Sequence, residues 1–90
     1  MIGITSIFEN RAVKIICEIP FNESITISKI SIGVYSTYSH THKLINILEN
    51  EKIVKTTKVG RCVWVSLTEK GSFIKSKLVE IEKKLSENIV

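Results

Sequence analysis

Short polar and basic side chains gather near the middle of this chain and in the segment that follows. Hydroxyl, imidazole, ammonium and amide groups occupy Ser36, Thr37, Ser39, His40, Lys43 and Asn46. A second, basic group consists of Lys55, Lys58 and Arg61. No Asp or Glu occurs within residues 25–47 or 53–67, so no carboxylate in these stretches opposes the donors. Such groups can donate hydrogen bonds to phosphate oxygens and base edges, which indicates a nucleic-acid-binding surface.

Catalytic and metal-binding chemistry have little support in the sequence. The chain contains no Asp, and no Ser/His or Cys/His pair belongs to a recognisable nucleophile motif, so we expect no enzyme. His40 and His42 lie about 200° apart around a predicted helix and cannot readily share one ion. We expect no cofactor and no metal within one chain. A metal site shared between subunits would need ligands that the sequence does not place.

The cysteines are isolated from each other. Cys17 and Cys62 have no neighbouring cysteine, which excludes a CxxC redox motif or a zinc ribbon within one chain. We expect two buried or half-buried thiols. A disulfide, particularly one between subunits, stays open as an alternative.

Length and composition indicate a single domain formed by residues 1–90. Hydrophobic residues make up 43% and charged residues 24%, which is typical of folded domains, and the net charge is +4. No apolar run could cross a bilayer and no secretory leader is visible, so we expect a soluble, cytoplasmic protein without a membrane partner. The abundance of Ile and Lys is compatible with an A/T-rich archaeal or viral genome.

The first predicted helix covers residues 7–18. Ser6 and Glu9 have capping-box spacing, an apolar stripe with helical periodicity follows, and Pro20 ends the pattern. Val13 and Cys17 fall beside that stripe. A partner subunit could therefore cover them.

Two further helices are expected before the basic segment. Thr26 can cap a short helix that ends at Gly33, and Ser36 or Thr37 can cap a longer one over about residues 37–51. The apolar stripe of the longer helix consists of Thr41, Leu44, Ile45 and Leu48. The polar side chains described first lie on its other faces.

Residues 53–67 change to a period of two, which predicts a β-hairpin with its turn at residues 58–61. Gly60 allows a tight turn at the tip. Trp64 is expected to pack in the core or at a subunit interface, since a lone strand aromatic is more often an anchor than a base-stacking group. Tyr35 and Tyr38 stay open between packing and phosphate contact.

Thr68 is expected to cap a last helix over residues 68–88. One side of this helix has the 4-3-4 spacing of a coiled-coil seam, formed by Ile74, Leu78, Ile81 and Leu85. Lys75 and several other charged residues fall largely on the other side. The seam could pair two subunits or pack within one chain, and we favour pairing because a single DNA-binding helix contacts only a few base pairs.

This order of elements resembles winged helix-turn-helix regulators of the MarR and ArsR type. The resemblance is strongest in residues 44–54, LINILENEKIV, and in residues 63–71, VWVSLTEKG. If Ser31 takes the small-residue position of the second helix, the usual turn glycine falls on Tyr35. The short wing and the lack of additional long helices argue against a large pocket for a small-molecule effector.

The resemblance implies an α+β fold: a three-helix core with a two-stranded β-hairpin wing in residues 7–67, and a C-terminal dimerisation helix in 68–88. It implies a homodimeric, sequence-specific regulator of transcription that binds double-stranded DNA. The recognition helix, about 37–51, would enter the major groove, and the wing, 55–61, would contact the flanking backbone or minor groove. The expected dimer interface consists of Val13, Cys17, Ile74, Leu78, Ile81 and Leu85. The alternative is a protein–protein interaction or assembly module without specific DNA binding.

Overall fold

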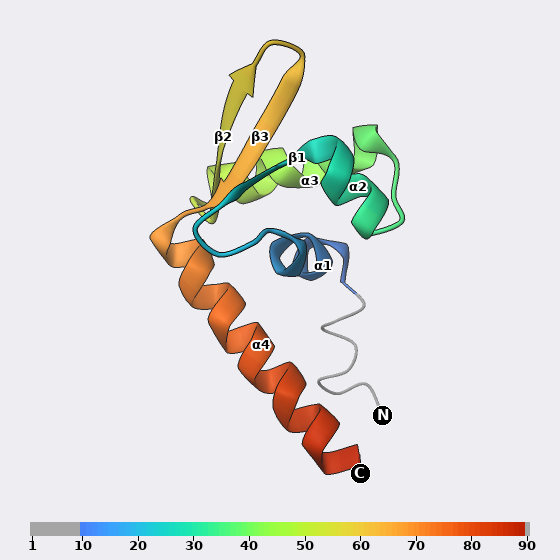
Figure 1. The fold of residues 1–90 in the computed structure, drawn as a ribbon, viewed down its shortest axis with the longest axis vertical. Helices are drawn as coiled ribbons and strands as arrows, with labels where there is room; N and C mark the ends of the chain where they lie inside the picture. Colours follow the sequence, from blue (N-terminus) through green and yellow to red (C-terminus); the bar gives the residue numbers. More distant parts are fainter. Residues whose placement is uncertain (1–9, 90) are drawn as a thin grey trace.

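Four helices and a three-stranded antiparallel sheet form residues 10–89, the part of the chain that this computed structural model describes (Figure 1). The helices are α1 (Arg11–Glu18), α2 (Ile27–Gly33), α3 (Tyr38–Asn50) and α4 (Glu69–Ile89). The strands are β1 (Ser24–Thr26), β2 (Val54–Val59) and β3 (Cys62–Leu67). The β2–β3 hairpin projects from the helical core, and α4 runs away from the hairpin in the opposite direction. This arrangement confirms the predicted winged helix-turn-helix.

Helix α1 is shorter than the sequence pattern indicated. Asn10 has an extended backbone, and its side chain accepts hydrogen bonds from the amides of Ala12 at 2.9 Å and Val13 at 3.3 Å. Asn10 is therefore the N-cap, and the helix begins at Arg11 rather than at residue 7. The predicted capping box of Ser6 and Glu9 lies outside the described residues.

The turn between α2 and α3 has the register that the resemblance implied. Thr26 caps α2 by accepting from the amide of Lys29 at 3.2 Å. Tyr35, where the motif usually has glycine, has a φ of +54°. This left-handed conformation lets the amide of Ser36 donate to the carbonyl of Ser31 at 3.0 Å, which closes the turn.

The sheet has one strand more than the predicted hairpin. Strand β1 pairs with β3 to give the order β1-β3-β2, with Ile25 opposite Val65. The turn of the hairpin is also tighter than the expected residues 58–61. Val59 and Cys62 form the last pair, so only Gly60 and Arg61 make the connection, with Gly60 at a φ of +61°.

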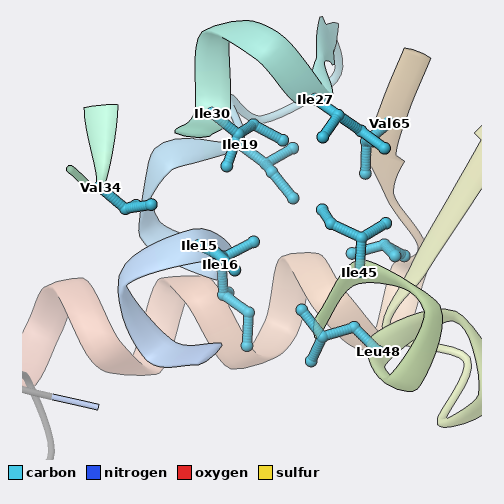
Figure 2. Packing of buried hydrophobic residues seen from close by; sticks show 10 residues of the cluster. Ile15, Ile16, Ile19, Ile27, Ile30, Val34, Ile45, Leu48 and Val65 are labelled. Carbon is cyan, nitrogen blue, oxygen red and sulfur yellow. The ribbon is translucent and has the colours of Figure 1, made fainter. Parts of the chain in front are cut away.

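The core lies where α1, α2, α3 and the inner face of the sheet meet. Figure 2 shows aliphatic side chains from these helices and from β3 packed against one another. The fully or nearly buried set is Ile15, Ile16, Ile19, Ile27, Ile30, Val34, Ile45, Leu48, Val54 and Val65. The apolar stripes predicted for the first and third helices supply half of this set, so their periodicity was a sound guide.

One hydroxyl in this core has no hydrogen-bond partner among the described residues. Thr41 of α3 is 0% exposed, and its Oγ1 is unsatisfied. A buried polar group without a partner costs about 1–3 kcal/mol, and valine has nearly the same shape without the hydroxyl. We therefore expect Thr41→Val to raise the free energy of unfolding by about 1 kcal/mol in urea denaturation.

The matched control is Thr37→Val in the same helix. Thr37 caps α3 by accepting from the amide of His40 at 3.2 Å, so its loss should lower the free energy of unfolding by about 1 kcal/mol. A Thr41→Val protein that is less stable than the unmodified chain would contradict the assignment of an unsatisfied hydroxyl.

Helix α4 is attached to the core at its N-terminal end. The Oγ1 of Thr68 accepts from the amide of Gly71 at 3.1 Å, which confirms the predicted cap. Lys75, expected on the exposed side, is instead half-buried: its Nζ donates to the carbonyl of Ile19 at 2.6 Å and lies 4.4 Å from the Phe21 ring centroid. The carbonyl at the end of α1 and the ring draw this cation inward.

Candidate nucleic-acid interface

The N-terminal part of α3 presents the polar side chains that the sequence singled out. The Thr37 cap starts the helix, and the buried stripe of α3 turns the other faces outward. The exposed members are Thr37, Ser39, His40, Lys43 and Asn46, whereas Ser36 is half-buried. A capped helix start with exposed hydroxyls and a lysine offers donors of the kind that bind phosphate oxygens and base edges.

The wing separates its three basic residues. Lys55 and Lys58 point to opposite faces of β2 because they are three residues apart. Lys55 lines a hollow near the base of the sheet with Asn22 and Glu23, away from the tip. Arg61 lies in the tip turn and is exposed. Lys58 and Arg61 therefore form the basic end of the wing, and Lys55 is apart from them.

Two hollows flank the start of α3. The first, which we call the wing-side groove, has a volume of about 210 Å³ and is lined by Thr26, Ile27, Ser28, Tyr38, Arg61, Cys62 and Val63. The second, which we call the turn-side groove, has a volume of about 620 Å³ and is lined by Arg11, Ser31, Ile32, Tyr35, Ser36, Thr37 and His40. The start of α3 thus has an arginine on each side.

Three side chains follow one another along α3 at intervals of four residues. The Tyr38 and His42 rings lie 5.9 Å apart between centroids, and Asn46 Nδ2 is 3.3 Å from His42 Nδ1. Tyr38 is 43% exposed and shares the wing-side groove with Arg61. For Tyr38 the sequence is compatible with both packing and phosphate contact, and His42 is not among the predicted DNA-binding residues. Tyr38, His42 and Asn46 are spaced four residues apart, and this spacing could have indicated that they share one face of the helix.

A carboxylate fixes the wing against α3. Glu49 Oε2 accepts from the Thr56 amide at 3.2 Å and from the Thr56 hydroxyl at 2.8 Å. Both residues are half-buried, so these charge-assisted bonds are partly shielded from water. Glu49 therefore positions β2 relative to α3, a role that the sequence did not reveal.

The expected dimer residues lie on α1 and α4. Ile74 and Leu78 pack partly against the core of their own chain, whereas Ile81 and Leu85 lie further along α4 and are half-buried. Val13 and Cys17 line a hollow of about 310 Å³ together with Glu18 and Glu82.

The cysteines are both free. Burial raises the pKa of the Cys17 thiol above its ordinary value, and the carboxylates of Glu82 and Glu18 add to this effect while Lys75 opposes it. Cys17 is therefore a protonated, weakly reactive thiol at neutral pH. Cys62 is exposed beside the wing tip, so the expectation that both thiols are covered holds only for Cys17.

Trp64 is not in the core. The alternation along β3 turns Val63, Val65 and Leu67 inward, so Trp64 lies on the outer face of the sheet and is 37% exposed. The core alternative for Trp64 is therefore wrong, as its alternation with Cys62 and Ser66 already indicated, and the alternative of a subunit interface stays a prediction.

Within residues 10–89, no group of three or more His, Cys, Asp or Glu side chains is arranged to hold a metal ion. None of the helices described there is long and apolar enough to span a membrane.

The helices, the antiparallel sheet and the projecting hairpin define a class of structure: a winged helix. No protein-family model and no curated protein matches the sequence. Several solved structures match in fold. AF1382 from Archaeoglobus fulgidus has 25% sequence identity and a TM-score of 0.82, and the match covers 90% of this chain and 93% of that one.

Two further structures match over a similar share of this chain. FabT from Streptococcus pneumoniae, solved in complex with DNA, has 23% identity and a TM-score of 0.80. The MarR family transcriptional regulator SPO1453 from Silicibacter pomeroyi DSS-3 has 15% identity and a TM-score of 0.79. Each match covers 88% of this chain and 57% of the other protein, so this chain spans little more than half of their length.

Proposed function

We propose that this chain is a sequence-specific regulator of transcription that binds double-stranded DNA as a homodimer. The observation that carries the proposal is the exposed start of α3, which bears Ser39, His40 and Lys43 and whose Tyr38 shares the wing-side groove with Arg61. In this arrangement α3 enters the major groove, and Lys58 and Arg61 contact the flanking backbone or minor groove. The complex of FabT with DNA supports the proposal, since that protein shares the fold.

Each side chain has a distinct task in this proposal. Lys43 and Asn46, on the exposed side of α3, face base edges, where lysine donates to guanine acceptors and asparagine pairs with adenine. Thr37 and the half-buried Ser36 lie at the helix start, where hydroxyls and backbone amides suit phosphate oxygens. Phosphate contacts set position, and base contacts select sequence. The role is one of binding, with no reaction and no cofactor.

Dimerisation doubles the length of the site that is read. The seam of α4 supplies Ile81 and Leu85, and α1 supplies Val13 and Cys17, all of them half-buried in the single chain. Ile74 and Leu78 contribute on the side that their own core leaves open. A second copy that covers these apolar groups sets two copies of α3 on successive major grooves about 34–36 Å apart.

Selection from fragmented genomic DNA at physiological salt tests the proposed function. We expect enrichment of particular fragments that contain an inverted repeat with half-sites about 10 base pairs apart, because a twofold dimer reads a twofold site. Uniform recovery of all fragments would contradict sequence-specific binding. Enrichment of a single half-site without a repeat would contradict the dimer and leave DNA binding intact.

A further inference from the structure

The turn-side groove contains a basic residue that the sequence analysis did not select. Arg11 is the first residue of α1, is exposed, and lies 20 or more positions before the other polar residues of the groove. Its Nη1 donates to the carbonyls of Val34 and Tyr35, both at 3.4 Å. The fold therefore brings a guanidinium to the end of α2, directly before the recognition helix.

Those two bonds leave much of the guanidinium's hydrogen-bonding capacity unused. Arginine has five N–H donors, and both of the bonds to the turn come from Nη1 and are long. The same groove is lined by Thr37 and His40, both exposed, and by Ser36. Among the described residues, no carboxylate lines it. Such a group of donors without an acidic neighbour matches an anion with several oxygens.

The position of the groove indicates which anion it meets. A helix in the major groove lies between the two sugar-phosphate backbones that border that groove. The wing-side groove, with Arg61, is on one side of the start of α3, and the turn-side groove, with Arg11, is on the other. The exposed aliphatic side chain of Ile32, at the same groove, suits the carbon atoms of a deoxyribose.

We propose that Arg11 binds a phosphate of the DNA backbone in the turn-side groove, opposite the strand that Arg61 of the wing contacts. The two arginines hold the two backbones, and α3 reads the bases between them. This inference rests on the proposed function and adds a contact from α1, outside both the recognition helix and the wing.

Salt dependence separates a phosphate contact from a purely structural role for Arg11. Each phosphate that a cation neutralises contributes about 0.9 to the slope of log K against log salt concentration. We expect Arg11→Gln to lower that slope by about 0.9 for each Arg11 removed and to weaken binding equally for preferred and unrelated duplexes. Arg11→Lys keeps the charge and should keep the slope.

The control is Lys83→Gln, which removes the same charge from the exposed surface of α4. If Arg11→Gln changes the slope no more than Lys83→Gln does, the contact is refuted. If both Arg11 variants lose affinity with an unchanged slope, Arg11 only holds the turn and the inference is wrong. A melting curve shows whether each variant is folded.

A second experiment needs only the unmodified protein and a selected duplex. Single neutral methylphosphonates are placed along each strand, and the affinity for each duplex is measured. We expect weakened binding from positions on both backbones that border the recognised groove. Sensitivity on the wing-side backbone alone would overturn the Arg11 contact while leaving the proposed function standing. A chain that selects no duplex would instead contradict the proposed function itself.

Discussion

Gly71→Ala is expected to destabilise the protein by about 3 kcal/mol, the largest single effect that the structure indicates. Gly71 is buried in the first turn of α4, and a Cβ there would collide with the backbone carbonyl of Ile53. That carbonyl also accepts from the amide of Thr68 at 3.1 Å and from its hydroxyl at 3.0 Å. A methyl group would therefore disturb the cap of α4 together with the packing beneath it.

The expected loss of stability is opposite in sign to the gain that helix propensity alone predicts, so the measurement distinguishes the two. Helix propensity alone would favour alanine over glycine by about 1 kcal/mol inside a helix. The close approach to Ile53 reverses that preference because a backbone carbonyl cannot move aside as a flexible side chain can. Thermal unfolding should show a melting temperature lower by roughly 12–24 °C for a domain of this size.

Gly60→Ala is the matched control. Nothing lies within 4 Å of a Cβ at Gly60, and its φ of +61° should cost about 1 kcal/mol. A Gly71→Ala protein as stable as Gly60→Ala, or more stable than the unmodified chain, would show that α4 does not approach Ile53 as closely as described.

Ser39→Ala combined with Lys43→Ala is expected to weaken binding to a preferred duplex by roughly 100-fold, or about 2–3 kcal/mol. Both side chains are exposed on α3, so their removal should leave stability nearly unchanged. The loss should be larger for preferred duplexes than for unrelated ones, because base contacts discriminate and phosphate contacts do not. Titration of both kinds of duplex measures the difference.

The control variant carries the same two substitutions on α4, Ser76→Ala and Lys83→Ala. These residues lie two positions after the seam residues Ile74 and Ile81, on the opposite side of the helix, and both are exposed. We expect its affinity to stay within about threefold of the unmodified chain. Equal losses from the two double variants would mean that α3 does not read the sequence.

Local patterns predicted most of the fold. The stripe of α3, with Thr41 and Ile45 fully buried, follows directly from the helical period, and Thr26 and Thr68 cap the helices where hydroxyl spacing placed them. The turn register could be inferred from the position of Ser31 relative to Tyr35. In each case the signal lies within a few residues of the feature that it predicts.

Features that depend on distant contacts could not be predicted. Strand β1 is three residues long and exists only because β3 pairs with it, about 40 residues later. Arg11 reaches Val34 and Tyr35 across more than 20 residues, and the tight approach of Gly71 to Ile53 depends on how α4 packs. The hydrogen bond from the Thr56 amide to Glu49 likewise depends on how β2 packs against α3. Such contacts join elements that are far apart in the sequence, so no local pattern indicates them.

The most direct test of the central claim is a titration of the unmodified chain with an enriched duplex and a scrambled duplex over a salt series. Sequence-specific recognition predicts at least a roughly thousandfold preference for the enriched duplex at physiological salt. Binding that ignores sequence and disappears near physiological salt would contradict the claim. The basic face of α3 and the wing would then belong to a surface for an acidic protein partner.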